Sequence, residues 1–397
     1  MENASRKSAL VKGIGSVGLV LALAACSSSA EVGGSDDPIL IGIPVGLTGA
    51  NSVIAPGVVQ ASELAAKEIN EAGGVLGRQI ELKIYDDQSG AAGALKAFTA
   101  ATQNDKVTGI VGMETTAARN AGQPVAAQTN TPYIYTSSYE GAACASNLFI
   151  NGSVPTQSVD PLVEWIGENI GATKYALIAS DYAFGRETGA YVEEVVAAAG
   201  SEMVSMQYNP MDSGDWTSIL NQIQRAQPDV VVSILAGGTP SVTLTKQWTE
   251  MGITIPHYSL GIDEETATTV GANAAGIRYP AAYFTGSESP ENKAFLAALE
   301  EEFGSEAHTP NQLTVPQYEG VHLMAKAIEK AGSTDPDAIL EAIPTVAYDG
   351  PSGTVQINEQ HHAALAMYLG EVQQDGTTVV IDDFGMVSPG EQCPDLS

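Results

Sequence analysis

Short apolar runs rich in β-branched residues alternate with helix-forming stretches from Pro38 onward, and this alternation limits the folds open to the chain. The runs are almost continuously apolar, as strands buried on both faces of a sheet require. Between them apolar residues recur at helical spacing, for example at Val58, Ala61, Leu64 and Ala65. The pattern predicts an α/β fold built from parallel, doubly wound sheets with helices on both faces. The predicted strands are residues 39–45, 80–85, 107–111, 133–135, 175–179, 203–208, 230–235 and 257–260.

Two sheets are expected rather than one, because the elements after Pro38 outnumber those of an ordinary single core. Breaks near residues 153–155 and 279–282 mark positions where the chain crosses between two lobes. After Tyr348 turns such as Gln374-Asp375-Gly376 join short strands, which indicates an antiparallel addition. The strands predicted in this addition are residues 354–357, 367–372 and 379–382. The predicted first lobe comprises residues 38–153 and 283–347, and the predicted second lobe comprises residues 154–282 and 348–397.

The N-terminal segment has the organisation of a secretory signal. Basic residues precede an apolar stretch over residues 14–25, which is too short and too rich in glycine for a stable membrane-spanning helix. Leu23-Ala24-Ala25-Cys26 resembles the bacterial lipobox, which implies cleavage before Cys26 and attachment of lipid to it. We expect residues 1–25 to be a lipoprotein signal peptide and residues 26–37 a lipidated, flexible tether. The folded part would then lie outside the cytoplasm, anchored to the bacterial cell membrane, and an ordinary signal peptide with a chance cysteine is the alternative.

Cysteine content predicts a disulfide, and net charge argues against a nucleic-acid partner. If Cys26 carries lipid, Cys144 and Cys393 remain as an even number in an oxidising compartment, and we predict a disulfide between them. Two free thiols are the alternative. The chain has 47 acidic and 17 basic residues and a formal charge of −30, so its surface repels phosphate backbones and no nucleic-acid partner is expected.

Signatures of catalysis and of cofactor binding are absent or misplaced. Gly13-Ile14-Gly15-Ser16-Val17-Gly18 matches the dinucleotide fingerprint, but it lies in the signal segment rather than between a strand and a helix. The sequence has no H-E-x-x-H, C-x-x-C or G-x-S-x-G pattern, and the neighbouring His361 and His362 would point to opposite faces of a strand. We therefore expect no enzyme, no metal and no cofactor.

The stretch from Asn70 to Arg78, Asn-Glu-Ala-Gly-Gly-Val-Leu-Gly-Arg, predicts a helix that ends at paired glycines and a tight turn into the next strand. It closely resembles the type I periplasmic binding proteins, the solute receptors of ABC importers for branched-chain amino acids and amides. The resemblance extends along nearly the whole mature chain and implies two Rossmann-like lobes, joined by three crossovers, that close around a small solute. The segments most similar to the short-chain amide and urea branch are Tyr139-Glu140-Gly141, Ser146-Asn147, Ser180-Asp181-Tyr182, Phe284 with Ser289-Pro290-Glu291-Asn292-Lys293, Asn358 to His362 and Leu369-Gly370-Glu371.

Ligands of open α/β sheets bind beyond the carboxyl ends of the strands. In the predicted first lobe, Thr48 follows the first strand, and Glu114, Thr115 and Thr116 follow the third. The two threonines and the N–H groups of a helix start suit a carboxylate or carbonyl oxygen. Capping of the helix is the alternative role, and it is favoured for Thr115. After the fourth strand, the resemblance implies an aromatic wall and polar contacts from Tyr135, Ser137 and Tyr139.

The predicted second lobe would supply the opposite wall. Asp181, Tyr182 and Phe184 follow one strand, and any single aromatic there packs more often than it binds. The candidates on the following loops are Gly237, Gly238, Thr239 and Asp263. Glu114 departs from the amide and urea branch, which typically has an aromatic residue at that position. A carboxylate in a closed cleft needs a cation or several donors, so Glu114 would receive an ammonium or amide N–H groups, or would point to solvent.

The resemblance implies a lipid-anchored substrate-binding protein of an ABC importer, which captures a small polar nitrogen solute and delivers it to permease and ATPase subunits. The sequence has no P-loop, so ATP would be hydrolysed by another subunit. Urea or a short-chain amide is the first ligand class and a branched-chain amino acid is the alternative. A ligand sensor that regulates a partner protein is the alternative function, and a monomer is expected.

Overall fold

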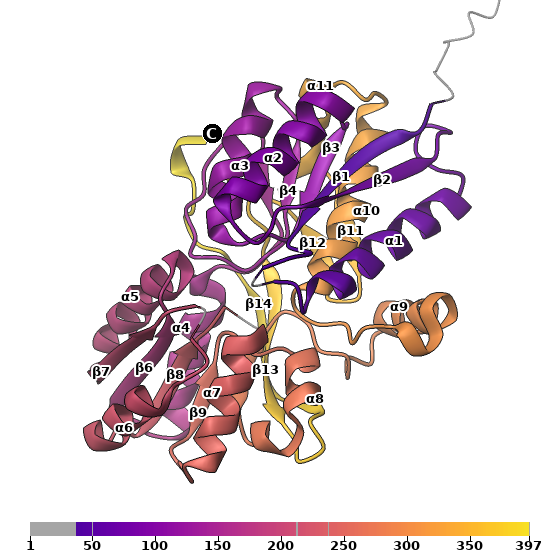
Figure 1. Cartoon of the computed structure of the whole chain (residues 1–397). Helices are drawn as coiled ribbons and strands as arrows, with labels where there is room; N and C mark the ends of the chain where they lie inside the picture. The colour runs from indigo at the N-terminus through magenta and orange to yellow at the C-terminus, as the bar shows by residue number, and fades with distance from the viewer. Residues whose placement is uncertain (1–36, 50, 212, 237, 397) are drawn as a thin grey trace, which may run out of the picture. The chain divides into compact units, whose positions relative to one another are not determined.

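The computed structural model describes residues 37–49, 51–211, 213–236 and 238–396. A five-stranded sheet occupies its N-terminal part, with the strand order β2-β1-β3-β4-β5 and every neighbouring pair parallel (Figure 1). The strand order reverses between β1 and β3, so the carboxyl ends of these two strands form a topological switch point. The strands are β1 (Ile39–Val45), β2 (Ile80–Asp86), β3 (Gly109–Gly112), β4 (Tyr133–Tyr135) and β5 (Leu148–Ile150).

Helices cover both faces of this sheet, and we call the sheet with its helices the first lobe. Ile41 and Ile134 belong to the core cluster formed with α1 and α10, whereas Ile110 and Tyr133 belong to the cluster formed with α2 and α3. Helix α9 packs against α1 and against a two-stranded hairpin of β11 and β12. The elements are α1 (Ala55–Glu71), α2 (Ala91–Thr99), α3 (Thr116–Gln128), α9 (Pro290–Phe303), α10 (Thr314–Ala331), α11 (Pro336–Ala342), β11 (Ala347–Gly350) and β12 (Gly353–Gln356).

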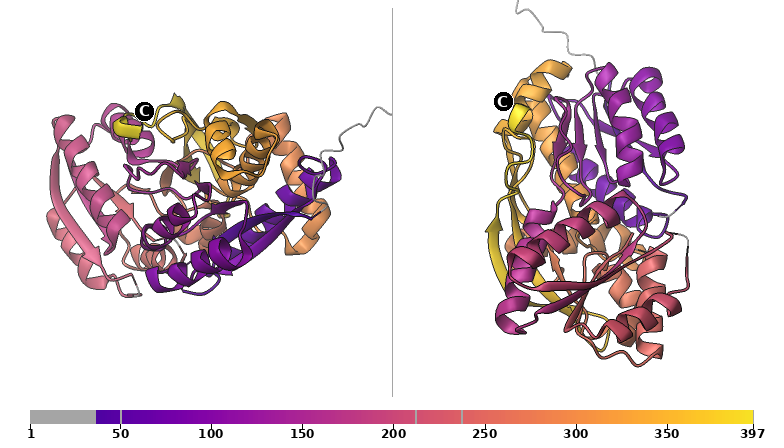
Figure 2. Two further views of the ribbon diagram at one scale, coloured as in Figure 1. Left: turned by 90° about the horizontal axis from the view of Figure 1, so that it is seen from above. Right: turned by 90° about the vertical axis from the view of Figure 1, so that its left-hand side faces the viewer.

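A seven-stranded sheet with the order β14-β13-β10-β9-β8-β6-β7 forms the centre of the second lobe. Its strands from β10 to β7 are parallel, and β13 and β14 add to one edge in antiparallel orientation (Figure 2). The strands are β6 (Lys174–Ser180), β7 (Glu202–Asn209), β8 (Val230–Ile234), β9 (His257–Ser259), β10 (Arg278–Ala281), β13 (Leu365–Val372) and β14 (Thr378–Val387). The helices are α4 (Pro155–Asn169), α5 (Ala183–Ala198), α6 (Thr217–Ala226), α7 (Gly238–Glu250) and α8 (Glu264–Val270).

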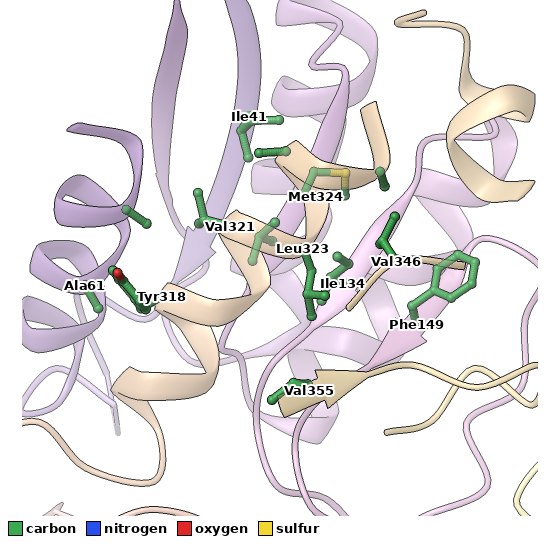
Figure 3. Packing of buried hydrophobic residues seen from close by; sticks show 14 of the residues in the cluster. Ile41, Ala61, Ile134, Phe149, Tyr318, Val321, Leu323, Met324, Val346 and Val355 are labelled. Carbon is green, nitrogen blue, oxygen red and sulfur yellow. The ribbon is translucent and has the colours of Figure 1, made fainter. Parts of the chain in front are cut away.

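The packing of α10 joins the late part of the chain to the first sheet. Val321 and Met324 of this helix lie near Ile41, and Leu323 lies near Ile134 of β4 (Figure 3). All of these side chains are buried. A helix far along the sequence therefore completes the core of the first lobe, which places the residues just before it at the carboxyl ends of β1 and β3.

The chain passes between the two sheets three times: after β5, after β10 and after β12. The predicted α/β fold with two doubly wound parallel sheets and an antiparallel addition is confirmed. The predicted glycine turn is also present, because Gly73 and Gly74 both have positive φ and a side chain at Gly74 would meet the Arg78 carbonyl. The predicted crossing near residues 279–282 agrees with the structure, in which the chain leaves the second sheet directly after β10 ends at Ala281.

Candidate functional site

A cavity of about 90 Å³ lies between the two lobes, where strands of both sheets have their carboxyl ends. Loops after β1, β3 and β4 line it from the first lobe, and loops after β6, β8 and β9 line it from the second. This is the position that the rule for open α/β sheets predicts. The lining residues are Asn51, Ile54, Met113, Glu114, Thr115, Thr116, Tyr135, Ser137, Ser138, Tyr182, Phe184, Leu235, Ala236, Leu260, Gly261, Ile262, Asp263, Gln312 and Leu313.

The start of α3 forms part of the first-lobe wall. Thr115 Oγ1 accepts a hydrogen bond from the N–H of Ala118 (3.2 Å), so the predicted capping role of Thr115 is confirmed. Thr116 Oγ1 donates a hydrogen bond to Glu140 Oε2 (2.7 Å), because an ionised carboxylate can only accept. Thr116 therefore offers oxygen lone pairs to the cavity, next to N–H groups of the helix start that have no acceptor within the helix.

A buried ion pair supports this wall from behind. Glu140 Oε1 accepts a hydrogen bond from Arg119 Nη2 at 2.7 Å, and the side chains are 6% and 3% exposed. The Arg119 guanidinium also lies over the rings of Tyr139 and Tyr135, at 4.4 and 5.0 Å from the ring centroids. The charge of Arg119 is thus committed to Glu140 and the two rings, and Arg119 is not among the residues that line the cavity.

Glu114 lines the cavity; one of its carboxyl oxygens is bonded within the first lobe, and the other, Oε1, is buried without a hydrogen-bond partner. Its Oε2 accepts a hydrogen bond from Tyr133 Oη (2.8 Å), and Tyr133 belongs to the core packed against α2 and α3. Tyr135 Oη donates to the Glu114 carbonyl at 2.9 Å. Burial, followed by the charge of Asp87, holds the pKa of Glu114 well above its usual range. The neutral acid is therefore favoured, which suits donation of a proton better than reception of an ammonium group.

Asp263 is the polar group of the second-lobe wall. It precedes α8 as the capping residue: Oδ1 accepts from Thr266 N (2.8 Å) and Oδ2 accepts from Thr266 Oγ1 (3.0 Å). The side chain is only 2% exposed, and no cation of the described residues forms an ion pair with it. Burial raises the pKa of Asp263 to about 6, so most of the population is ionised at neutral pH. A buried carboxylate without a counter-ion is suited to a ligand cation or to several N–H donors.

Aromatic and aliphatic side chains form the rest of the lining. The predicted residues Tyr135, Ser137, Tyr182 and Phe184 all reach the cavity, and Tyr182 lies beside Phe184 with ring centroids 6.1 Å apart. Sequence reasoning did not select the aliphatic residues, which are found in the same strand-end loops or ahead of α1 and α10. These aliphatic residues are Ile54, Met113, Leu235, Leu260, Ile262 and Leu313.

Five predicted site residues lie outside this cavity, and one of them, Asp181, accepts a hydrogen bond from Arg186 Nε (2.7 Å) instead. Thr48 is exposed and donates to Asp86 Oδ2 (2.8 Å), which ties the loop after β1 to the end of β2. Tyr139 is fully buried, with its hydroxyl bonded to His362 Nε2 rather than directed into the cavity. Gly238 and Thr239 begin α7, and the neighbouring residues Leu235 and Ala236 line the cavity in their place. Gly237 and Cys26 lie outside the described residues.

Cys144 and Cys393 are joined by a disulfide in the structure, with their Cα atoms 5.6 Å apart. The bond links the loop that precedes β5 to the tail that follows β14. Within residues 37–396, where described, no group of His, Cys, Asp and Glu side chains has the arrangement of a metal site. The described helices include none that is long and apolar enough to span a membrane.

Burial raises the pKa of four carboxyl groups into the range of physiological pH. The pKa of Asp87 and Asp263 is raised to about 6, and that of Glu264 and Glu319 to about 7. Burial has the opposite effect on the bases and lowers the pKa of His257 and of His362 to about 4. The folded protein therefore binds protons at these carboxyl groups more tightly than the unfolded chain does. At the two histidines it binds them more weakly than the unfolded chain does.

We expect the protein to be more stable at pH 5.5 than at pH 8. Between these values the four carboxyl groups take up protons in the folded state only, which stabilises it as pH falls, whereas the two histidines oppose this effect below pH 6.5. At about 1.4 kcal/mol for each pKa unit, these six groups favour pH 5.5 by about 2–3 kcal/mol, and Glu114, whose pKa burial holds well above its usual range, acts in the same direction. Thermal melts in one buffer series measure the difference, and a Tm that falls steadily from pH 8 to pH 5.5 would contradict it.

Comparison with known proteins agrees with this geometry. A family model described as periplasmic binding protein matches residues 38–377. Leu/Ile/Val-binding protein homolog 6 of Brucella melitensis biotype 1 is 24% identical over 267 residues, which are 64% of this chain and 67% of that protein. An ABC transporter substrate-binding protein from Sphaerobacter thermophilus superposes with a TM-score of 0.80 at 25% identity, over 89% of this chain and 99% of that chain.

A solute binding protein of an ABC transporter from Rhodopseudomonas palustris BisB5, in complex with 3,4-dihydroxy benzoic acid, superposes with a TM-score of 0.81. It is 25% identical, and the match covers 89% of this chain and 99% of that chain. These relatives are named as binding proteins, not as enzymes. Since the family match spans most of the sequence, the chain belongs to the periplasmic binding protein family and has its type I, two-lobed α/β fold.

Proposed function

We propose that this protein is the extracytoplasmic solute receptor of an ABC importer, which holds a small polar nitrogen compound between its lobes and delivers it to permease and ATPase subunits. Family membership and the similarity to an ABC transporter substrate-binding protein support the role. The cavity between the strand ends of the two lobes supports capture by closure, because a ligand buried from both sides makes hydrogen bonds in a water-poor site.

The ligand that this cavity favours is an amino acid with an aliphatic side chain. One observation carries this proposal: a buried, unpaired carboxylate at Asp263 faces a cavity whose other polar wall is the N-terminal end of α3. The carboxylate suits the ammonium of the ligand, and the N–H groups at the helix start suit its carboxylate. The aliphatic lining between them suits a leucine, isoleucine or valine side chain.

Urea and short-chain amides, the ligands that the resemblance to the amide and urea branch implies, fit the lining less well. Their small, polar surface would leave the aliphatic side chains at Ile54, Leu260 and Leu313 without a partner of their own kind. An aromatic acid without an amine is disfavoured for another reason, because no lysine, arginine or histidine is among the lining residues. Its carboxylate would lie in one cavity with Asp263 and gain no compensating charge.

A panel of ligands tests the proposal through thermal stability. L-leucine, L-isoleucine, L-valine, urea, acetamide and 4-hydroxybenzoate would each be added in excess to the whole chain. A ligand present at a hundred times its Kd adds about 2.7 kcal/mol, which raises Tm by several degrees. Shifts with the three amino acids and none with the others are the expected result. A Tm shift with urea or acetamide alone would contradict the amino-acid proposal and identify an amide or urea as the ligand.

We further propose that Cys26 carries lipid and that the receptor works as a monomer at the membrane surface. The lipobox-like Leu23-Ala24-Ala25-Cys26 sequence supports the anchor. Residues 26–37 would then connect the anchor to the folded part, whose first strand is β1. Intact-mass measurement on protein from the membrane fraction decides the point, because an unmodified mature N-terminus would exclude the anchor.

A further inference from the structure

The segment just ahead of α10 is fixed to the first lobe. His308 donates its backbone N–H to Gln60 Oε1 of α1 (2.9 Å). Asn311 is fully buried and its Oδ1 accepts from the N–H groups of Leu313 and Thr314, at 2.9 and 3.2 Å. Residues 308–313 therefore move with α1 and α10, although they follow the crossing from the second lobe.

Two side chains of this segment reach the second lobe. Gln312 Nε2 donates to the carbonyl of Ile262 at 3.0 Å, and His308 Nδ1 is 2.7 Å from Glu265 Oε1. Ile262 and Glu265 lie on either side of Asp263 in the chain, at the start of α8. The loop that carries the buried carboxylate of the cavity is thus held from both sides by the other lobe.

We propose that Gln312 and His308 are positioning residues of the solute site, which set the distance between Asp263 and the start of α3. The proposal rests on the proposed function, since it assigns a role in holding the solute. A zwitterionic ligand needs its cation and anion partners at one fixed separation, and these partners belong to different lobes. Contacts that hold the Asp263 loop against the first lobe keep that separation and slow the escape of the solute.

His308 is important to the Asp263 loop because of the surroundings of Glu265, its hydrogen-bond partner. Glu265 is 18% exposed on its side chain, its Oε2 is buried without a hydrogen-bond partner, and His308 is the one base paired with it among the described residues. Loss of His308 would remove the hydrogen bond to Oε1 and leave this half-buried carboxyl group beside Asp263 without it. The resulting cost is relieved when the loop moves away from the first lobe, which opens the site.

Gln312→Ala tests the first contact, with Gln373→Ala as its matched control. Gln373 Nε2 also donates to a backbone carbonyl at 3.0 Å, that of Glu371, but within the second lobe. In stopped-flow fluorescence with L-leucine, we expect Gln312→Ala to raise the dissociation rate about 5- to 20-fold with little change in the association rate. Gln373→Ala should leave both rates unchanged. Equal rates in the two variants would overturn the proposal.

His308→Asn and His308→Ala test the second contact, because the asparagine amide retains a donor near the Nδ1 position. The alanine variant should release L-leucine faster than wild type, and the asparagine variant should recover most of the wild-type rate. Hydrogen exchange on the ligand-free protein separates this proposal from the choice of ligand. Amides of residues 262–266 should exchange faster in Gln312→Ala than in Gln373→Ala even if leucine does not bind, and unchanged exchange there would refute the role.

Discussion

Asp263→Asn should weaken binding of L-leucine by roughly 10²- to 10³-fold, which corresponds to about 3–4 kcal/mol. The substitution removes the one charged group with which the second-lobe wall can neutralise an ammonium, and leaves the shape of the side chain unchanged. Asparagine also caps helices well, so its Oδ1 can still accept from Thr266 N and α8 should remain folded. Titration calorimetry measures the affinity, and circular dichroism checks the fold.

Asp335→Asn is the matched control, since Asp335 is the exposed capping residue of α11 and its carboxylate accepts from the N–H groups of Asp337 and Ala338. The same chemical change there should leave affinity unaltered. Wild-type affinity in Asp263→Asn would show that this carboxylate does not hold the ammonium of the ligand. Thermal stability of Asp263→Asn above pH 6 should be equal to or higher than that of wild type, because a buried charge without a counter-ion is removed.

The same group sets the pH dependence of binding. Because burial raises the pKa of Asp263 to about 6 in the empty site, the carboxylate is largely protonated below that pH and no longer attracts a cation. Affinity for L-leucine should therefore be constant above pH 7 and fall as pH drops below 6, by up to tenfold for each pH unit. In Asp263→Asn this fall should disappear, which separates Asp263 from the other titrating carboxyl groups.

Sequence patterns predict most of the sheet strands because burial on both faces leaves long apolar runs. Residues 175–179 and 230–235, for example, are nearly the observed β6 and β8. The pattern misses β5, Leu148–Ile150; three residues are at the limit of what periodicity distinguishes, and the equally short β4 and β9 are predicted. This segment becomes a strand only because β4 pairs with it on one side and the crossing near His362 bridges it on the other.

The site is predictable only where it follows a strand. Tyr135 is the last residue of β4, and Thr116 and Asp263 follow β3 and β9 closely, so the rule for α/β sheets selects all three. Gln312 and Leu313 precede a helix and lie far from every other lining residue in the sequence, so no local signal marks them. They reach the cavity because α10 packs onto the first sheet, which is a property of tertiary structure.

Tyr139 illustrates the opposite error. It follows β4 and is aromatic, as a residue of the cavity wall would be. However, the Arg119 guanidinium lies over its ring, and its hydroxyl is hydrogen-bonded to His362 Nε2. A position at a strand end makes a contact with the ligand possible, but contacts with buried charged residues such as Arg119 determine whether the side chain reaches the cavity. Arg119 and Glu140 are close to Thr116 and Tyr139 in the sequence, yet their pairing depends on the contact between two loops.

Loss of the disulfide should lower the free energy of unfolding more than loss of any single side chain of the solute site. Cys144→Ser with Cys393→Ser opens a covalent loop between residues 249 positions apart, which lets the unfolded chain explore far more conformations. We expect the free energy of unfolding to fall by about 2–5 kcal/mol, as measured by urea denaturation. Either single serine variant should lose about as much as the double variant, because each breaks the same bond.

The location of the bond determines what else should change. Other hydrogen bonds also hold the tail near the disulfide: Gln392 Oε1 accepts from Ala142 N, Gln360 Oε1 accepts from the N–H groups of Gln392 and Cys393, and the Pro389 carbonyl accepts from Thr156 Oγ1. Neither cysteine lines the solute cavity. The double serine variant should therefore bind L-leucine as wild type does while unfolding at lower urea concentration. A stability loss below about 1 kcal/mol would mean that the tail contacts alone hold this region, and a loss of affinity would mean that the tail constrains the lobes themselves.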